Sequence, residues 1–283
     1  MSKVPVWMRL LRLYSLHAPF QRGTYRIALW LYHYLRVPDV EVETTLDRTL
    51  YVTLRLPIWV DYNIYCLGLY EAPLARFFIR SLRPDAWVLD IGAYIGQYTL
   101  LAAKYALYGQ VIAFEPHPES FARLQAHVAR NHLSNVLAFQ EAVGEGKGML
   151  PLVLSGQASD SALCPQSQAG MRSADAIEVK VTSLDEFVQE QGLPRVDLVK
   201  IDVEGAEGKV LRGAERILKE FCPLLIVEID RSREAVWGDC PESIVAMLEK
   251  YGYALYILKG WHIRPFSRPV DYANLIAIPR RGL

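Results

Sequence analysis

Acidic residues that follow short apolar segments are the first candidates for chemistry in this sequence. One of them is Asp90, in "WVLDIGAYIGQYTLLAAKYA" (87–106), where an apolar run leads through a glycine-containing turn into a helical pattern. Such turns often bind nucleotides, and their usual dinucleotide pattern is G-x-G-x-x-G. Here the glycine positions of that pattern hold Asp90, Gly92 and Ile95. A carboxylate would repel a pyrophosphate, so the turn favours a ligand that brings hydrogen-bond donors or positive charge.

S-adenosylmethionine fits this requirement, because it carries an ammonium and a sulfonium group and no phosphate. Gly92 and Gly96 would let the backbone approach such a ligand closely. Glu115 follows Gly96 by nineteen residues, in "AFEPHP" at the end of the next predicted strand. An acid at this distance can accept hydrogen bonds from both ribose hydroxyls of an adenosine. NAD contains the same ribose, so Glu115 predicts an adenosine ligand and Asp90 favours S-adenosylmethionine. Further candidates for contact with this ligand are Pro116, Glu141 and Ala142.

A second group of acids follows the fourth and fifth predicted strands, "VDLVKID" and "PLLIVEID". It contains Asp202, Glu204 and Glu228. The carboxyl ends of neighbouring parallel strands meet at one edge of a sheet, where ligands bind. We therefore expect these carboxylates to converge. Oxygen ligands of this kind also bind divalent cations, so a metal site stays open as an alternative.

The spacing of apolar residues predicts the elements that carry these acids. From residue 87 to about 260, short apolar strands alternate with helical patterns through short connections. This alternation is typical of a parallel sheet flanked by helices. The last two predicted strands, "YALYILK" and "YANLIAIP", are expected to pair antiparallel. A polar stretch at 155–176 interrupts the alternation and is either a lid over the substrate or an insertion without a role.

The first 66 residues follow a different pattern. Helices are expected near 7–17 and 23–36, and an alternating segment after them predicts a strand or hairpin. Arginines interrupt the apolar and aromatic residues, so no uncharged stretch approaches the roughly 18 residues of a membrane span. The pattern indicates amphipathic helices. They either pack on the main domain or a partner, or contact a membrane surface through residues 1–37.

Composition narrows the function classes further. The 283 residues include 31 Lys and Arg and 31 Asp and Glu, so a formal net charge of zero gives no overall attraction to nucleic acid. The four cysteines have neither C-x-x-C nor zinc-finger spacing. This favours reduced thiols and a cytoplasmic protein, with a membrane-peripheral location as the variant that the N-terminal residues suggest.

The sequence resembles FkbM-type S-adenosylmethionine-dependent methyltransferases from about residue 68 to about 260. The most specific match is "KIDVEGAE" at 200–207. A general methyltransferase signature, D-x-G-x-G-x-G, is matched only in part, because Tyr94 stands at its middle glycine; the FkbM-type form tolerates a larger residue there. The other stretches that carry the resemblance are "VLDIGAYIGQYTL", "VIAFEPHPESFARL", "VTSLDEF" and "PLLIVEI".

The resemblance implies an α/β, Rossmann-like class I methyltransferase fold. Its seven-stranded, mostly parallel sheet has the order 3-2-1-4-5-7-6, with the last strand antiparallel and helices on the flanks. A methyltransferase domain would cover 67–283 and leave 1–66 as an N-terminal extension. The start of the helix after the turn would lie near the carboxylate of the cofactor. The cofactor-binding residues implied are Asp90, Gly92, Ala93, Gly96, Tyr98, Thr99, Glu115 and Asp202, with Tyr70 and Glu71 of "GLYE" closing over the cofactor.

We therefore predict an S-adenosylmethionine-dependent methyltransferase that methylates a hydroxyl of a sugar, a glycan or a secondary metabolite. A hydroxyl must lose its proton, which requires a base or a metal ion. Asp202 is the first candidate for a base or an acceptor-positioning group, with Glu204 and Glu228 beside it. One alternative is an NAD(P)-dependent oxidoreductase or sugar-nucleotide enzyme, which would share Glu115. A second is a non-catalytic scaffold. The acceptor, the metal requirement and the oligomeric state stay open.

Overall fold

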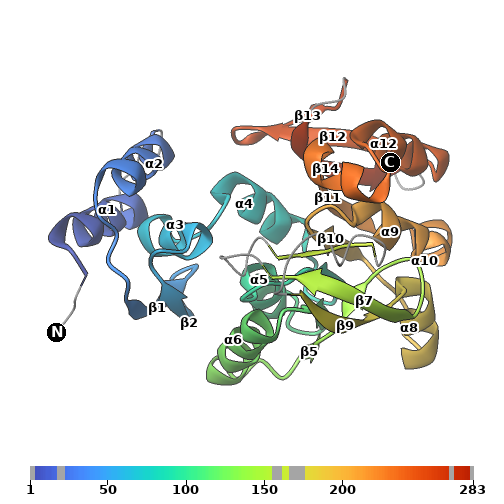
Figure 1. Ribbon diagram of the computed structural model, residues 1–283, viewed down its shortest axis with the longest axis horizontal. Coiled ribbons are helices and arrows are strands. Elements are labelled where there is room, and N and C mark those ends of the chain that lie inside the picture. The colour runs from blue at the N-terminus through green and yellow to red at the C-terminus, as the bar shows by residue number, and fades with distance from the viewer. Residues whose placement is uncertain (1–3, 18–22, 155–160, 166–175, 268–270, 281–283) are drawn as a thin grey trace.

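The computed structural model describes residues 4–17, 23–154, 161–165, 176–267 and 271–280. Within them, a central eight-stranded sheet is flanked by helices (Figure 1). Five strands run parallel in its middle and at one edge: β3 (Trp87–Ile91), β4 (Gln110–Phe114), β5 (Val136–Phe139), β10 (Leu198–Ile201) and β11 (Leu224–Asp230). The alternation of short apolar strands and helical patterns therefore predicted the type of sheet correctly.

The other edge of the sheet is antiparallel. It contains β12 (Tyr253–Lys259), β13 (His262–Pro265) and β14 (Tyr272–Pro279). As expected, β12 pairs antiparallel with β14, and β14 also pairs antiparallel with β11. The full order is β13-β12-β14-β11-β10-β3-β4-β5. Counted along the chain without β13, this is 3-2-1-4-5-7-6.

The eighth strand, β13, corrects the expected number of seven. It lies in a segment that the sequence pattern left as a connection. Gly260 begins a two-residue turn and has a φ of 61°, and β13 then pairs back onto β12 from Lys259 and His262. A positive φ at the first turn residue suits a tight hairpin, and glycine adopts it without strain. The turn therefore extends the sheet by one strand.

Helices follow the parallel strands on both faces. They are α5 (Gln97–Tyr105), α6 (Pro118–Arg130), α8 (Leu184–Gln191), α9 (Glu207–Arg212), α10 (Glu215–Glu220), α11 (Arg231–Glu234) and α12 (Pro241–Lys250), with a 3₁₀ turn at Ala235–Trp237. The helical pattern "AEGKVLRGAERILKE" (206–220) after the fourth predicted strand is divided into α9 and α10. Gly213 lies at the division, where a Cβ would stand 2.1 Å from the Gly144 carbonyl oxygen. The chain bends there to pass this neighbouring loop.

A second, smaller sheet lies beside the central one. It has the order β6-β9-β7-β8 and contains β6 (Ala142–Val143), β7 (Gly148–Val153), β8 (Ala162–Leu163) and β9 (Ala176–Thr182). The apolar segment "NVLAFQEAV" (135–143) is therefore divided between the two sheets, since β5 belongs to the central sheet and β6 to the smaller one. Of the polar stretch at 155–176, only residues 161–165 and 176 are described. The proposed lid thus lies largely outside the described residues.

The N-terminal elements lie together at one end of the molecule (Figure 1). They are α1 (Val6–His17), α2 (Thr24–Tyr34), the hairpin of β1 (Glu41–Leu46) and β2 (Leu50–Arg55), and α3 (Trp59–Leu67). Helix α4 (Ala72–Ser81) lies between this group and the central sheet. Met8, Leu54 and Tyr62 are buried in the same hydrophobic cluster as Leu100 of α5. The described part of the extension therefore shares a core with the helix that follows β3. None of the described helices is both long enough and apolar enough to cross a bilayer.

Strand β3 shows how the sheet buries both of its faces. Val88 packs into the cluster that contains α5 and the N-terminal elements, whereas Leu89 and Ile91 pack into the cluster on the opposite face. Side chains alternate between faces along a strand, so Asp90 projects to the face of Val88. A carboxylate at such a position is costly unless it finds a partner. Its surroundings are part of the site described next.

Candidate active site

A cavity of about 560 Å³ lies where β3, β4, β10 and β11 end. This size is typical of sites for small molecules. Helices α2 and α3 contribute Leu29, Tyr32, His33 and Trp59 to its wall. The cavity is also lined by most of the residues that the sequence nominated: Tyr70, Gly92, Ala93, Tyr98, Glu115, Pro116, Glu141, Ala142, Asp202, Glu204 and Glu228.

Four nominated residues are not among those that line the cavity. Asp90 and Thr99 are fully buried behind the wall, where the Thr99 hydroxyl donates a hydrogen bond of 2.5 Å to Asp90. Gly96 instead faces Leu124, which a Cβ would meet at 2.5 Å. Glu71 accepts bonds of 3.3 Å from the amide of Asn274. Asp90 is thus hydrogen-bonded to Thr99 and is not among the lining residues, and its predicted contact with the cofactor stays a prediction.

Glu115 is held in place by the backbone around it. One carboxylate oxygen accepts a bond of 2.7 Å from the N–H of Tyr94, and the other accepts one of 2.8 Å from the N–H of His117. Burial raises the pKa of Glu115 to about 7, although these backbone bonds act to lower it. A carboxylate of this kind has lone pairs left for ligand hydroxyls. Its position at the end of β4 is the one expected for a ribose-binding acid.

Tyr94 occupies the position of a signature glycine, and the structure explains how it is tolerated. Its φ is 51°, in the left-handed region that glycine adopts most easily. Three interactions of Tyr94 offset the cost of this backbone conformation. Its N–H donates to Glu115, its hydroxyl donates to Asp61 at 3.3 Å, and the Arg123 guanidinium lies 5.8 Å from its ring centre. Arg123 also forms an ion pair with the buried Asp61. Tyr94 thus links the turn to α3 and α6.

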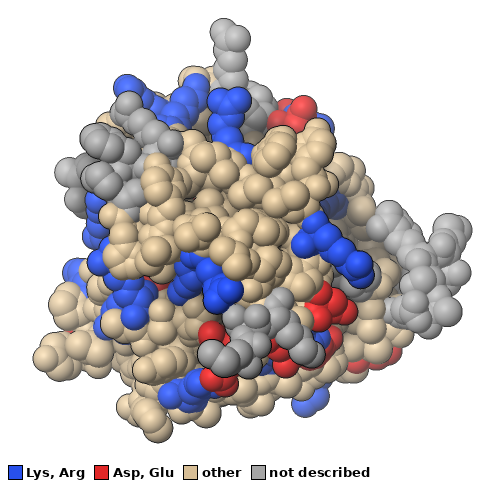
Figure 2. Space-filling model, turned by 90° about the vertical axis from the view of Figure 1, so that its left-hand side faces the viewer, with Lys and Arg blue, Asp and Glu red and all other residues tan. Residues whose placement is uncertain are grey.

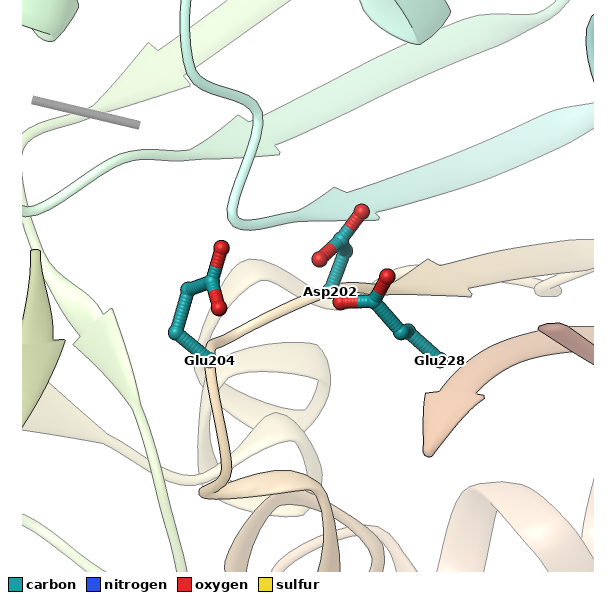
Figure 3. A group of neighbouring side chains, drawn as sticks. All are labelled: Asp202, Glu204 and Glu228. Carbon is teal, nitrogen blue, oxygen red and sulfur yellow. The ribbon is translucent and has the colours of Figure 1, made fainter. Parts of the chain in front are cut away.

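The acids at the ends of β10 and β11 converge as expected. Oxygen atoms of Asp202, Glu204 and Glu228 lie within 4.8 Å of one another. Figure 3 shows the three carboxylates close together, with Asp202 and Glu204 in the chain that follows β10 and Glu228 near the end of β11. The Lys200 ammonium, almost completely buried, donates a bond of 2.9 Å to Asp202. The Tyr272 hydroxyl donates one of 2.6 Å to Glu228.

These contacts set the protonation of the group. Burial acts to raise the pKa of Asp202, but the Lys200 ammonium outweighs it and holds that pKa below its usual range. Burial and the neighbouring Asp202 raise the pKa of Glu228 well above its usual range. At neutral pH, Asp202 is therefore ionised and Glu228 carries a proton. Lys200 stays charged, because nearby carboxylates raise its pKa despite burial. Asp202 and Glu228 together can accept and share a proton at the cavity wall.

The same contacts bear on the open question of a metal. Glu204 forms an ion pair with Arg233, Asp202 pairs with Lys200, and Glu228 binds Tyr272. Each of the three carboxylates thus has a partner within the chain, and two of those partners are cations. A divalent ion would have to compete with both positive charges. Nothing in this arrangement requires a cation.

Comparison with known proteins identifies the family. Residues 90–255, more than half of the chain, match the methyltransferase FkbM domain. The chain belongs to this family. The protein is a methyltransferase with a Rossmann-like α/β fold, as the resemblance of its sequence motifs implied.

Named relatives of this FkbM-family methyltransferase come from fungi, archaea and bacteria. Methyltransferase 1 of Beauveria bassiana is 29% identical over 70% of this chain and 82% of its own length. The hexuronic acid methyltransferase AglP of Haloferax volcanii is 28% identical over 67% of this chain and 72% of its own. The 31-O-demethyl-FK506 methyltransferase FkbM of Streptomyces tacrolimicus is 31% identical over 48% of this chain and 62% of its own.

Solved structures similar to this methyltransferase are distant in sequence. The precorrin-6y C5,15-methyltransferase of Geobacter metallireducens is 14% identical, with a TM-score of 0.43 over 73% of this chain and 87% of its own. A TehB-like SAM-dependent methyltransferase of Corynebacterium glutamicum is 12% identical, with a TM-score of 0.43 over 77% of this chain and 94% of its own.

Several site residues of this methyltransferase were missed by the sequence reasoning. Lys200 is the clearest case, and a lysine inside the apolar strand "LVKI" was the available signal. It faces the same side of the sheet as Asp90, its partner in the β3–β10 register, and lies 5.2 Å from the ring centre of Tyr98. Tyr272 and Asn274 come from β14, and Asn274 is paired with Glu228 across the sheet. Only the antiparallel pairing of β11 with β14 brings them to the acids.

The buried Glu207 holds the loop between β10 and α9. One of its oxygens accepts backbone bonds of 3.0 Å from Val203 and 3.2 Å from Gly205. Burial raises the pKa of Glu207 to about 7 and that of Glu234 to about 8. Unfolding would return both to about 4.5. Between these values the folded state binds more protons than the unfolded state, so stability falls as the pH rises.

We expect the thermal midpoint of the ligand-free protein to fall as the pH rises from about 5 to about 8. Glu207→Gln should flatten this slope, because glutamine has the shape of the protonated acid but cannot ionise. Differential scanning fluorimetry across the pH range measures both. The exposed Glu249→Gln is the matched control and should keep the original slope. An unchanged slope in Glu207→Gln would show that another group causes the effect.

Proposed function

We propose that this chain transfers the methyl group of S-adenosylmethionine to a hydroxyl oxygen of a polar, ring-containing acceptor. The observation that carries the proposal is the position of two sites on one cavity wall. Glu115 lies at the end of β4, and the ionised Asp202 lies at the end of β10. The first suits an adenosine ribose, and the second suits an acceptor that must lose a proton.

The chain offers a place for each part of this cofactor. Glu115 would accept hydrogen bonds from the ribose hydroxyls. Glu141 and Ala142, which follow β5 in the chain, would contact the adenine. The Tyr98 hydroxyl is buried on the cavity wall and has no hydrogen-bond partner in the described part of the chain. Such a group is costly without a ligand. The ionised Asp202 suits the positive charges of the cofactor.

When bound, the cofactor supplies a methyl group on a sulfonium sulfur, which is already activated for displacement. The chain then has to align the acceptor oxygen, exclude water and take up a proton. Asp202 accepts the hydrogen bond of the acceptor hydroxyl and receives its proton as the oxygen–methyl bond forms. Lys200 keeps Asp202 ionised until that point. Glu228 and Tyr272 hold the carboxylate in place from β11 and β14.

The aromatic residues from α2 and α3 support an acceptor with a ring. Trp59 and Tyr32 line the cavity with ring centres 4.8 Å apart, and His33, Glu204 and Arg233 add polar groups to its lining. Flat aromatic surfaces beside charged groups fit the apolar face and the hydroxyls of a sugar. One relative, the hexuronic acid methyltransferase AglP, is named for a sugar acid, and another, the 2-O-methyltransferase NoeI of Sinorhizobium fredii, is named for methylation of oxygen. The first name supports a sugar-like acceptor for this chain, and the second supports transfer to a hydroxyl.

Glu115→Ala should weaken the binding of S-adenosylhomocysteine by roughly 100-fold, because two hydrogen bonds to a carboxylate are lost. Isothermal titration of the purified protein with S-adenosylhomocysteine, NAD and NADP in parallel measures the effect. The unmodified protein should bind S-adenosylhomocysteine alone. The matched control is Glu119→Ala, an exposed acid at the start of α6, which should bind as the unmodified protein does.

The same titration separates the competing functions. Binding of NAD or NADP would mean an oxidoreductase, and binding of none of the three would favour a non-catalytic scaffold. Unchanged affinity in Glu115→Ala, with an unchanged far-ultraviolet spectrum, would place the ribose elsewhere. Once binding is established, release of S-adenosylhomocysteine in the presence of uronic acids, neutral sugars and hydroxylated macrocycles would identify the acceptor class.

A further inference from the structure

Helices α1 and α2 expose an apolar surface that the fold itself does not use. Val6, Leu10 and Leu13 of α1 are exposed, as are Ile27, Trp30 and Tyr34 of α2. These six residues are called the N-terminal face. On α1 they recur at intervals of four and three, which places them on one side of the helix. Met8 and Leu11 are buried on the other side. The helix is therefore apolar on two sides, and only one of them packs against the core.

The charge in this part of the chain is of one sign. Residues 1–38 contain six Lys and Arg and no Asp or Glu, although the whole chain has 31 of each class. Arg9, Arg26 and Arg36 are exposed. Arg12 is not free for a ligand, because it donates to the carbonyls of Tyr65 and Thr45. Figure 2 shows this end of the molecule as a broad area without charged side chains, which is bordered mostly by Lys and Arg and at its lower edge also by Asp and Glu.

From this combination we infer that the N-terminal face docks on an anionic lipid surface. Amphipathic helices with arginine beside tryptophan, tyrosine and leucine bind in the plane of the membrane interface. Trp30 and Tyr34 are stacked with ring centres 5.2 Å apart, a flat surface suited to the level of the headgroups. A second copy of this chain is a poorer occupant, since a two-fold contact would bring two sets of unbalanced arginines together.

Docking would place the cavity close to the lipid, because α2 contributes residues both to the cavity and to the N-terminal face. Leu29, Tyr32 and His33 of α2 line the cavity. Ile27 and Trp30 of the same helix belong to the N-terminal face. An α-helix with its side chains is about 10 to 12 Å across. A docked molecule would thus hold its cavity about one helix diameter from the lipid. The docking itself does not depend on the proposed methyl transfer.

Vesicle co-sedimentation of the full chain tests the inference. One set of vesicles contains phosphatidylcholine alone, and the other an equimolar mixture with phosphatidylglycerol. The chain should sediment with the second set and only weakly with the first. Replacing Arg9, Arg26 and Arg36 together by alanine should weaken partitioning by roughly 100-fold, since each arginine near an anionic surface contributes about fivefold. High salt should weaken it as well.

A double variant, Leu10→Glu with Trp30→Glu, should abolish sedimentation. Met149→Glu on β7 is the matched control: Met149 is 48% exposed, against 60% for Leu10 and 56% for Trp30. Strand β7 lies away from α1 and α2 (Figure 1), so this variant should sediment as the unmodified chain does. All variants change exposed side chains, so their thermal midpoints should match that of the unmodified protein.

Three results would overturn the inference. They are equal binding to both kinds of vesicle, equal binding of the double variant and the Met149 variant, and no binding at all. Sedimentation velocity without lipid adds a separate readout. A dimer that the double variant converts to a monomer, together with no vesicle binding, would assign the N-terminal face to a second copy of the chain.

Discussion

Asp202→Asn should reduce turnover by roughly 100- to 1,000-fold and leave the affinity for S-adenosylhomocysteine largely unchanged. Asparagine fills the same space but cannot take a proton from the acceptor. Lys200 would lose its ionised partner, but Glu228 lies close to both and can release its own proton to balance the charge. The fold should therefore tolerate the change. Turnover is measured as the release of S-adenosylhomocysteine with the acceptor found by screening, and affinity by calorimetry.

The matched control for this prediction is Asp230→Asn. Asp230 is the last residue of β11 and lies near the site, as Asp202 does at the end of β10. It caps α11 by accepting bonds from the N–H groups of Ser232 and Arg233, and it is not among the residues that line the cavity. Asparagine caps helices as well as aspartate does, so turnover should stay within about twofold of the original. If Asp202→Asn kept full turnover, the base would have to be sought elsewhere. If it lost cofactor affinity as well, the role of Asp202 would be in binding.

Gly92→Ala should destabilise the folded protein by roughly 2 to 5 kcal/mol, the sum of a left-handed backbone and an overpacked core. The φ of Gly92 is 80°, and a Cβ there would stand 1.8 Å from the carbonyl oxygen of Asp202. That oxygen belongs to the backbone after β10 and cannot turn aside. The change would force β3 and β10 apart and move Asp202. Urea denaturation followed by circular dichroism measures the loss, and cofactor affinity should fall with it.

Gly146→Ala is the control for the loss of a glycine as such. No atom lies within 4 Å of a Cβ at Gly146, and its φ is not in the left-handed region. Its stability should stay within about 1 kcal/mol of the original, with a small gain from the less flexible unfolded chain. A Gly92→Ala protein as stable as this control would mean that the strands can separate without cost.

Gly92 also shows that a glycine can meet a requirement that the sequence does not reveal. The sequence predicted that this glycine allows a ligand to approach the backbone, and Gly92 does line the cavity. The structure adds that the chain itself comes close there, at Asp202, which lies 110 residues later in the sequence. Glycine spacing indicates that another group approaches the backbone at that point. It does not identify the group, because β10 lies beside β3 only as a result of the strand order of the sheet.

For the acids of the site, the sequence predicted the grouping and did not predict the protonation. Asp202, Glu204 and Glu228 were expected to converge, because each follows an apolar strand and the strands were expected to be parallel. Their protonation was not predictable. It depends on Lys200, which lies in the strand itself, and on Tyr272 from the antiparallel edge of the sheet. Charges act over distance in space, and the distance between these groups follows from the pairing of β11 with β14.

By itself, the sequence determined the local elements of this protein. Apolar periodicity gave the alternating strands and helices, turn residues gave their limits, and the acids at the strand ends gave the edge of the sheet where the cavity lies. These are properties of neighbouring residues, and a short window contains them. The tertiary structure decided what each acid contacts, Thr99 for Asp90 and Lys200 for Asp202, and it placed residues of α2 and α3 in the wall of the cavity. Such contacts join segments far apart in the chain, and only the packed sheet brings them within reach.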